Sequence, residues 1–385
     1  MDYRKMSLVS HYNWKGKIEV KCNVPVSCKE ELCLAYTPGV AEPCLEIAKD
    51  INKSFELTRR WNTVAVITDG TAILGLGDIG PEAGMPVMEG KCALFKAFGD
   101  VDAFPICLKT KDSEEIINTI KIISGSFGGI NLEDISAPRC FEIESRLKEE
   151  LNIPVFHDDQ HGTAIVVGAA LLNALELVNK EIGNIKVVLN GAGAAGIAIS
   201  KYLLNLGVKH LVVCDKAGII IDKDERFNHA QQELARLINK DSISGTLKDA
   251  MVNADVFIGV SARNVVSKEM VKSMNEKAIL FPLANPVPEI SYEDAKEAGA
   301  YIVGTGSSEK PNQINNVLVF PGLFRGALDA KTKKVTKEMM IAATYAIKNT
   351  VSKEQLSIEY ILPYAWDKKA HENVANAVKE AALNK

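Results

Sequence analysis

Short apolar runs alternate with helical patterns through the second half of the chain. From residue 163 the sequence reads as a long helix that is apolar on nearly every side, which indicates a buried helix. A strand, a glycine-rich turn, a helix and another strand then follow, as in a βαβ unit. This alternation predicts an α/β domain built on a doubly wound parallel sheet. We expect its strands at residues 185–190, 210–215, 254–260, 277–283, 300–304 and 316–322.

The first 160 residues mix shorter helical and strand patterns and are expected to form a separate, mixed α/β domain. The expected helices are 41–51, 113–124 and 139–151, and the expected strands are 63–70, 102–108 and 153–159. Ser113 is a candidate N-cap for the helix at 113–124. The chain therefore divides into residues 1–160 and 161–385. The second domain ends in a helical tail, from about residue 337, that can pack back on the first.

Composition and charge fit a protein that acts on small molecules. The chain has 385 residues, a formal net charge of −4 and 47% hydrophobic residues, which suits a globular protein of about two domains. Without a basic excess, we expect neither nucleic acid nor a membrane as a partner. The eight cysteines form no CxxC pair, which favours reduced thiols. No apolar signal segment begins the chain, so we expect a cytoplasmic protein.

A glycine-rich turn follows the strand expected at 185–190. Gly191, Gly193 and Gly196 match the spacing G-x-G-x-x-G, with a helix starting near Ala194. Glycines there permit a tight turn and a close approach of the backbone, and the start of the helix favours an anion such as a pyrophosphate. The turn predicts a dinucleotide site. The alternative is a purely structural glycine turn in another kind of α/β protein.

An acidic residue at the end of the next strand bears on which dinucleotide is bound. Asp215 lies 19 residues after Gly196, at the spacing from which a carboxylate accepts hydrogen bonds from the adenosine ribose hydroxyls. Its charge repels a 2′-phosphate, so it favours NAD over NADP. Lys216 follows directly and can soften that preference, which leaves NADP as an alternative.

Two aspartates lie between two histidines in VFHDDQHGTA, residues 155–164. His157, Asp158, Asp159 and His161 either form part of a metal cluster or make a polar turn before the apolar run that begins at Ala164. Adjacent carboxylates repel each other, more so when they are buried, and a divalent cation relieves that repulsion.

A second acidic pair, Glu133 and Asp134, lies in NLEDISAP, residues 131–138. Oxygen ligands select a hard ion, so carboxylates from the two segments would hold Mg²⁺ or Mn²⁺. Such an ion has little use for imidazole, which makes His157 and His161 structural or supporting residues rather than ligands. Taken alone, the Glu133–Asp134 pair also fits a surface cap at a helix start.

Lys91 and Tyr36 are candidates for carrying protons. Lys91 lies between a glycine and an apolar run in MPVMEGKCALF, and Tyr36 lies in LAYTPGVAEP. A lysine that works as a base needs its pKa lowered from about 10.4 towards neutrality, and burial and a nearby metal cation both act in that direction. The alternatives are a surface lysine and a core tyrosine beside a Pro-Gly turn.

Together these motifs resemble the malic enzymes, in particular their compact bacterial-type NAD(P)-dependent form. The resemblance covers roughly residues 30–330, with the motifs in the family's order. It implies an N-terminal domain for substrate and metal, and a Rossmann-type NAD-binding domain with C-terminal helices. The matching segments are AYTPGVAEPC, VITDGTAILGLGDIGP, PVMEGKCALFKAFG, DAFPICL, FGGINLEDISAPRCFEIE, IPVFHDDQHGTAIVV, NGAGAAGIAI, LANPVPE and NNVLVFPG.

The resemblance also implies a role for each candidate residue. Lys91 would be the general base and Tyr36 the general acid, with Asp158 orienting the catalytic residues. The implied metal ligands are Glu133, Asp134 and Asp159, and the implied substrate-binding residues are Tyr36, Lys91, Asn285 and Asn315. The implied cofactor-binding residues are Thr163, Gly191, Gly193, Ala194, Ala195, Gly196, Asp215, Lys216, Ser261 and Asn285.

The activity implied by the resemblance is oxidative decarboxylation of (S)-malate to pyruvate and CO₂. It would reduce NAD or NADP, need Mg²⁺ or Mn²⁺, and extend to oxaloacetate decarboxylation, in a homodimer. Two alternatives stay open: a malolactic-type lyase that forms lactate, and an inactive nucleotide-sensing protein. One departure is Ala72, where larger members of the family carry an arginine that grips a malate carboxylate. Another residue, from this subunit or a neighbouring one, must supply that contact.

Overall fold

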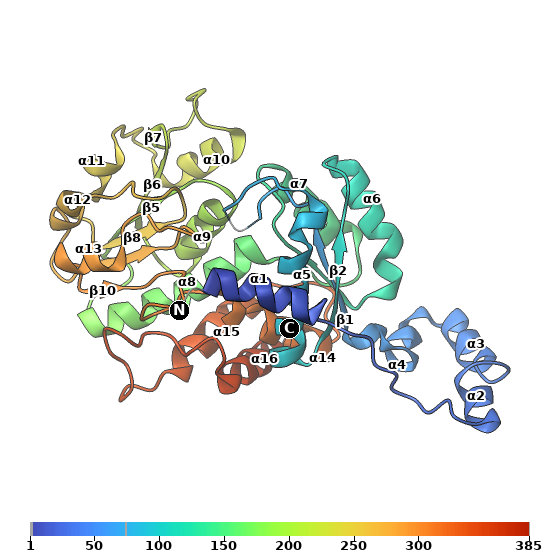
Figure 1. Ribbon diagram of the computed structural model, residues 1–385. Helices are drawn as coiled ribbons and strands as arrows, with labels where there is room; N and C mark the ends of the chain where they lie inside the picture. The colour runs from blue at the N-terminus through green and yellow to red at the C-terminus, as the bar shows by residue number, and fades with distance from the viewer. Residues whose placement is uncertain (1–2, 74, 385) are drawn as a thin grey trace.

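The first of two parallel sheets lies in the N-terminal half of the chain. In this computed structural model, which describes residues 3–73 and 75–384, the sheet has the strand order β2-β1-β3-β4 and only parallel pairings (Figure 1). β1 is buried along its whole length, as expected of a central strand in a covered parallel sheet. The strands are β1 (Thr63–Thr68), β2 (Asp102–Cys107), β3 (Gly129–Leu132) and β4 (Val155–His157).

Two helices beside this sheet, α6 and α7, match predicted ones. A third helix, α5, carries Lys91 and was not predicted from the sequence patterns. The cap of α6 is Asp112, which accepts from the Glu115 N–H at 2.9 Å, so the prediction of Ser113 as N-cap is wrong by one residue. The helices are α5 (Pro81–Gly99), α6 (Ser113–Ile123), η3 (Ser124–Ser126) and α7 (Arg139–Glu150).

The second sheet has the order β10-β9-β8-β5-β6-β7, and all its pairings are parallel except that of β7 with β6. The chain runs outward from β5 to one side and then returns to β8 on the other, so the order reverses between β5 and β8. Ligands of open α/β sheets bind at such a switch point. The predicted doubly wound, Rossmann-type domain is confirmed. Its strands are β5 (Lys186–Asn190), β6 (His210–Asp215), β7 (Gly218–Ile219), β8 (Val256–Gly259), β9 (Ile279–Pro282) and β10 (Ile302–Val303).

The helices around the second sheet complete this unit. The predicted strand at 316–322 is wrong, because this segment forms η4 and the start of α14. Short apolar runs do not distinguish strand from buried helix, and here Pro321 in the first turn favours the helix. The elements are α9 (Ala194–Asn205), α10 (His229–Ile238), α11 (Leu247–Met251), α12 (Lys268–Lys272), α13 (Tyr292–Glu297) and η4 (Asn316–Leu318).

The long helix α8 and the last three helices join the two units. α8 (Asp158–Val178) is mostly buried, and the predicted boundary at residue 160 falls in its first turn. Within the described residues α8 alone is long and apolar enough to cross a membrane, a test that a buried core helix also passes. α14 (Phe320–Asp329) and α16 (Lys368–Leu383) pack on α5, and α15 (Lys337–Thr350) packs on α8, so the tail does return to the first unit.

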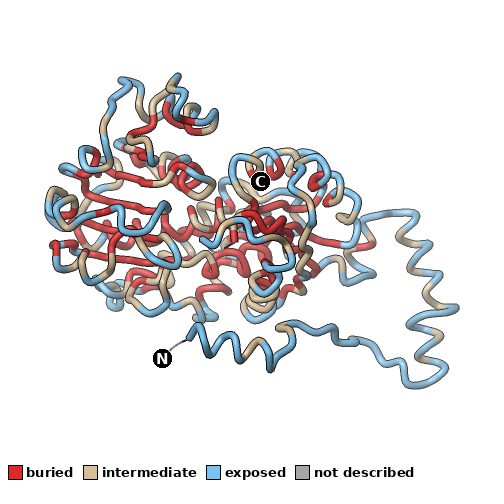
Figure 2. Tube along the Cα trace, turned by 45° about the horizontal axis from the view of Figure 1, so that its top comes forward, coloured by how far each residue is buried: buried red, intermediate tan, exposed pale blue. Residues whose placement is uncertain are grey.

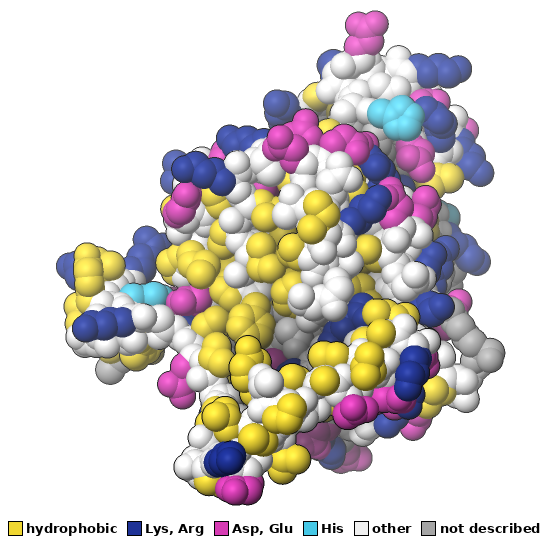
Figure 3. All heavy atoms as spheres, turned by 90° about the vertical axis from the view of Figure 1, so that its right-hand side faces the viewer, with side chains coloured by type: hydrophobic (Ala, Val, Ile, Leu, Met, Phe, Trp, Pro, Cys, Tyr) yellow, Lys and Arg dark blue, Asp and Glu magenta, His cyan; other side chains and the backbone are white. Residues whose placement is uncertain are grey.

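An N-terminal arm, residues 15–53, projects beyond the first sheet (Figures 1 and 2). It follows α1 (Tyr3–Trp14), and neither α1 nor the arm's helices α2 and α3 contain a buried residue. Hydrophobic side chains gather on the face of the molecule from which the arm projects (Figure 3). The elements of the arm and its junction are α2 (Lys29–Ala35), α3 (Ala41–Lys49), η1 (Ile51–Lys53), α4 (Ser54–Leu57) and η2 (Arg59–Asn62).

Candidate active site and dinucleotide pocket

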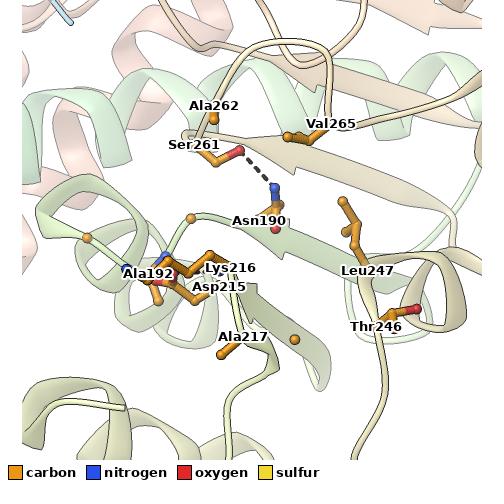
Figure 4. A pocket seen from close by; sticks show the side chains of 13 residues that line it. Asn190, Ala192, Asp215, Lys216, Ala217, Thr246, Leu247, Ser261, Ala262 and Val265 are labelled. Atoms are coloured by element: carbon orange, nitrogen blue, oxygen red, sulfur yellow. Dashed lines mark hydrogen bonds between the residues drawn. The ribbon is translucent and has the colours of Figure 1, made fainter. Parts of the chain in front are cut away.

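A pocket of about 560 Å³ lies at the carboxyl ends of β5, β6 and β8, where the strand order reverses (Figure 4). Five of the predicted cofactor residues line it: Gly191, Gly193, Asp215, Lys216 and Ser261. The other predicted cofactor residues, Thr163, Ala194, Ala195, Gly196 and Asn285, are not part of its lining. The lining residues that sequence patterns missed are Asn190, Ala192, Ala217, Gly218, Thr246, Leu247, Ala262 and Val265.

The three glycines of the turn serve different purposes. Gly191 has φ +109°, and a Cβ there would lie 2.5 Å from the carbonyl oxygen of Val260. A Cβ on Gly196 would lie 1.7 Å from the carbonyl oxygen of Gly191. No atom lies within 4 Å of a Cβ built on Gly193, which borders the pocket. Two glycines are therefore needed for the backbone to pack, and the third leaves open space beside the pocket.

Asp215 is held in place by donors from three directions. Its Oδ2 accepts hydrogen bonds from the Ala192 N–H at 3.2 Å and from Nε2 of Gln231 at 2.8 Å, and its Oδ1 accepts from the Lys216 N–H at 2.6 Å. The Lys216 side chain is exposed. The predicted ribose-binding carboxylate thus borders the pocket, and Gln231 is a supporting residue that no local pattern pointed to.

Ser261, on the opposite wall, connects the pocket to the first unit. Its hydroxyl accepts from Asn190 Nδ2 at 2.8 Å, and its N–H donates to Oε1 of the fully buried Glu289 at 2.7 Å. The other oxygen of Glu289 accepts from the Ala284 N–H at 3.1 Å, next to Asn285. A Cβ on Gly75 would lie 2.2 Å from the carbonyl oxygen of Asn285. Asn285 therefore lies where the cofactor unit meets the loop that follows β1.

Lys91 is the only buried lysine or arginine in residues 3–73 and 75–384. Its Nζ donates to Oε1 of Glu133 at 2.8 Å and to Oδ2 of Asp158, and it lies 4.0 Å from the centroid of the Phe320 ring. α5 brings in the lysine, the loop after β3 brings in Glu133, and the first turn of α8 brings in Asp158. Three segments far apart in sequence thus meet in one charged cluster.

The pKa values in this cluster are shifted by burial and by charge. Burial raises the pKa of Asp158 to about 8, although Lys91 acts against it, and burial also raises the pKa of Glu133. Burial acts to lower the pKa of Lys91, but the charges of Asp158 and Glu133 outweigh it, and the net pKa is raised. The two carboxylates therefore stabilise the ammonium, and the lowering that a catalytic base needs stays a prediction.

The predicted metal ligands surround this cluster. Asp134 has φ +53°, and its N–H donates to Oδ2 of Asp159 at 2.8 Å. Among residues 3–73 and 75–384, no three His, Cys, Asp or Glu side chains are arranged to hold an ion. The charge balance nevertheless fits a cation. Glu133 and Asp158 are both buried against the ammonium of Lys91, Asp134 is buried next to Glu133 in the chain, and Oδ1 of Asp158 is buried without a hydrogen-bond partner. The metal site stays a prediction.

The two histidines support the start of α8. Oε2 of the buried Glu144 contacts Nε2 of His161 at 2.9 Å, and its Oε1 accepts from the His157 N–H at 3.0 Å and contacts Lys148 Nζ at 2.7 Å. Burial lowers the pKa of His157 to about 4, so its ring is neutral. Glu144 is a further supporting residue that local patterns missed.

The remaining candidate residues, Tyr36, Asn315 and Thr163, do not belong to the Lys91 cluster. Tyr36 ends α2 on the arm with 67% of its surface exposed, so within one chain the structure does not bring it to Lys91. Asn315 caps η4 by accepting from the Val317 N–H at 2.9 Å, just before α14 and its Phe320. Thr163 is half-buried in the second turn of α8.

Comparisons with known proteins agree with this arrangement. Residues 15–148 match the malic enzyme N-terminal domain, and residues 160–383 match the malic enzyme NAD-binding domain. A bifunctional malic/malolactic enzyme of Bacillus subtilis is 55% identical over 384 residues, covering 100% of this chain and 94% of that one. An NAD-dependent malic enzyme of Geobacillus stearothermophilus is 56% identical, with coverages of 95% and 77%.

A solved structure agrees as well. The crystal structure of an NAD-dependent malic enzyme from Thermotoga maritima has a TM-score of 0.93 and 52% identity, and it covers 97% of this chain and 98% of that chain. The matches to both domains and the similarity along the whole chain confirm the resemblance seen in the motifs. The chain belongs to the malic enzyme family.

Proposed function

We propose that this protein catalyses the oxidative decarboxylation of malate to pyruvate and CO₂. As a member of its family it is an oxidoreductase that depends on NAD or NADP. The observation that carries the proposal is the buried contact of Lys91 with Glu133 and Asp158. This contact supports the proposal, because an amine that could carry a proton lies among carboxylates in the same molecule as a dinucleotide pocket.

The residues of the cluster divide the chemistry between them. Lys91 Nζ takes the proton from the C2 hydroxyl of malate, and Asp158 holds the amine in place. Glu133, Asp134 and Asp159 would hold Mg²⁺ or Mn²⁺, which fits their excess of negative charge. When bound, the dinucleotide supplies the hydride acceptor, and the ion supplies a Lewis acid and a positive charge that favours neutral Lys91.

Tyr36 would protonate C3 of the product enolate, and we propose that it does so from a second copy of the chain. Its position on the exposed arm keeps it away from Lys91 of its own chain. The arm also exposes Val20, Leu34 and Ile51, at 85%, 79% and 66% of their surfaces. Apolar side chains exposed together in this way are typical of a surface that another protein covers. A homodimer with exchanged arms would cover them and complete both sites.

The activity is tested with purified protein, malate, Mn²⁺ and NAD or NADP. We expect NADH or NADPH to accumulate together with pyruvate, and Lys91→Met to abolish this reaction. The control is Lys96→Met on the same helix, because Lys96 pairs with Asp100 and Asp102, which do not belong to the buried cluster. Wild-type turnover in Lys91→Met would remove Lys91 from the mechanism.

Mixed dimers test the exchange of arms. Tyr36→Phe chains and Lys91→Met chains, refolded together, form one complete site in each mixed dimer if Tyr36 acts across the interface. Random pairing of a symmetric dimer then restores about a quarter of the wild-type activity. Activity no higher than that of the two parents would show that Tyr36 acts within its own chain or not at all.

A malolactic reaction is the second candidate, favoured by the name of the Bacillus subtilis relative, which matches the whole of this chain. In that reaction malate yields lactate and no free NADH accumulates. Measuring lactate and NADH in the same assay separates the two reactions. The cytoplasmic location stays a prediction from the sequence.

A further inference from the structure

Gln231 joins three parts of the dinucleotide pocket from behind. It lies in the first turn of α10 with 8% of its surface exposed. Its Nε2 donates to Oδ2 of Asp215 at 2.8 Å and to the carbonyl oxygen of Ala192 at 3.1 Å, and its Oε1 accepts from the Asn228 N–H at 2.9 Å. Both N–H donors of the amide and one of the two acceptor positions on its oxygen are therefore used. The side chain therefore has one fixed orientation.

This arrangement leaves Asp215 one direction in which to bind a ligand. A carboxylate oxygen accepts about two hydrogen bonds. Oδ2 has both, from Gln231 and the Ala192 N–H, whereas Oδ1 has one, from the Lys216 N–H. The remaining acceptor position is on Oδ1, and Asp215 borders the pocket. Without the Gln231 amide, Oδ2 would lose its shorter bond and the carboxylate could rotate.

We infer that Gln231 is a positioning residue that sets the preference between NAD and NADP. It does so by holding the Asp215 carboxylate, still charged, against the ribose position. The inference rests on the proposed role of Asp215 as the ribose-binding residue. Because the Gln231 amide is neutral, it fixes the carboxylate without cancelling its charge. A fixed negative charge cannot turn away from a 2′-phosphate, whereas a loosely held one can.

The size of the effect follows from Coulomb's law. The charge of the carboxylate repels a 2′-phosphate held a few ångströms away. Releasing the carboxylate would relieve part of that repulsion, and we expect a change of about tenfold in relative affinity. The exposed Lys216 lies beside the same carboxylate and is available to a 2′-phosphate once Asp215 moves.

Ligands without a nicotinamide test the inference apart from catalysis. Binding of ADP-ribose and of its 2′-phosphate is measured by calorimetry, without malate or metal, and the ratio of the two dissociation constants is compared between variants. We expect Gln231→Leu, which lacks both amide groups, to shift the ratio towards the 2′-phosphate by about tenfold. Gln231→Glu also lacks the amide donor but brings a second negative charge to the same place, so we expect it to shift the ratio towards the 2′-phosphate less than Gln231→Leu does.

The control is Gln232→Leu on the same helix. Nε2 of Gln232 donates to the carbonyl oxygens of Asp224 and Phe227 at 3.2 and 2.7 Å, so it supports the fold equally but does not touch Asp215. We expect the control to leave the ratio unchanged. Thermal unfolding of each variant shows that it is folded.

Two outcomes overturn the inference in different ways. If Gln231→Leu weakens both ligands equally while Asp215→Asn still shifts the ratio, Gln231 only supports the fold. If Asp215→Asn also leaves the ratio unchanged, the proposed role of Asp215 fails and the inference fails with it. A shift of the ratio in Gln231→Leu that Gln232→Leu does not share is what a merely structural residue would not produce.

Discussion

One added methyl group is expected to have opposite consequences at Gly193 and Gly196, which lie in the same turn. At Gly196 the new Cβ would lie 1.7 Å from the carbonyl oxygen of Gly191, whereas real Cβ atoms essentially never come within 3.0 Å. The oxygen belongs to the backbone and cannot turn away, so α9 must move relative to β5. At Gly193 nothing lies within 4 Å, and φ is −89°, which alanine adopts without strain.

The expected magnitudes follow from this geometry. Overpacking of a rigid contact costs about 3 kcal/mol, so Gly196→Ala should lower the thermal midpoint by roughly 6–12 °C. Gly193→Ala should change the free energy of unfolding by less than about 0.5 kcal/mol. It should nevertheless weaken NADH binding at least about tenfold, because its Cβ occupies the space through which a pyrophosphate approaches the helix start.

Differential scanning calorimetry and fluorescence titration with NADH measure the two effects on the same preparations. The reasoning is refuted if Gly196→Ala is as stable as the wild type, or if Gly193→Ala loses as much stability as Gly196→Ala. It is also refuted if Gly193→Ala binds NADH as well as the wild type does.

Three further substitutions probe the buried polar groups. Asp158→Asn removes one of the crowded buried carboxyl groups but loosens Lys91, so we expect the midpoint of urea unfolding to rise while kcat falls about a hundredfold or more. Glu144 has its pKa lowered, because its interactions with His161 and Lys148 outweigh burial. Its stabilising effect is full above pH 4.5 and lost below it, so Glu144→Gln should destabilise by about 2 kcal/mol at pH 7 and less at pH 3.5, by urea unfolding. Glu289→Gln leaves the Ala284 or Ser261 N–H without an acceptor, which should lower stability by about 2 kcal/mol and raise KM for NAD.

Local patterns predicted the parts of the structure that are themselves local. Apolar runs bounded by turns predicted strands such as β1 and β6. The spacing of the glycines between a strand and a helix predicted the Gly191–Gly196 turn. Asp215 could be found because its distance along the chain from the turn is fixed by the βαβ unit. These features depend on residues that are close together in the sequence, and the structure contains them at the predicted positions.

Residues that act through distant contacts could not be found in this way. Gln231 forms a capping box with Asn228, which reads as an ordinary helix start, and its bond to Asp215 depends on how α10 packs on β6. Glu144 meets His157 and His161 only because α7 lies beside β4. The failure at 316–322 has the same origin, since tertiary packing decided between strand and helix.

Asp158 lies fully buried in the first turn of α8. Burial opposes its ionisation, as its raised pKa records. Two features act against that cost: the positive end of the helix dipole, which favours anions in the first turn, and the contact with Lys91. Neither is sufficient for Glu133 as well, because Glu133 shares the ammonium of Lys91 with Asp158. The surplus charge destabilises the folded chain when no cation is bound and is what would attract a divalent ion. The same carboxylates therefore connect low stability without metal to affinity for metal, and a neutral substitution should change both together.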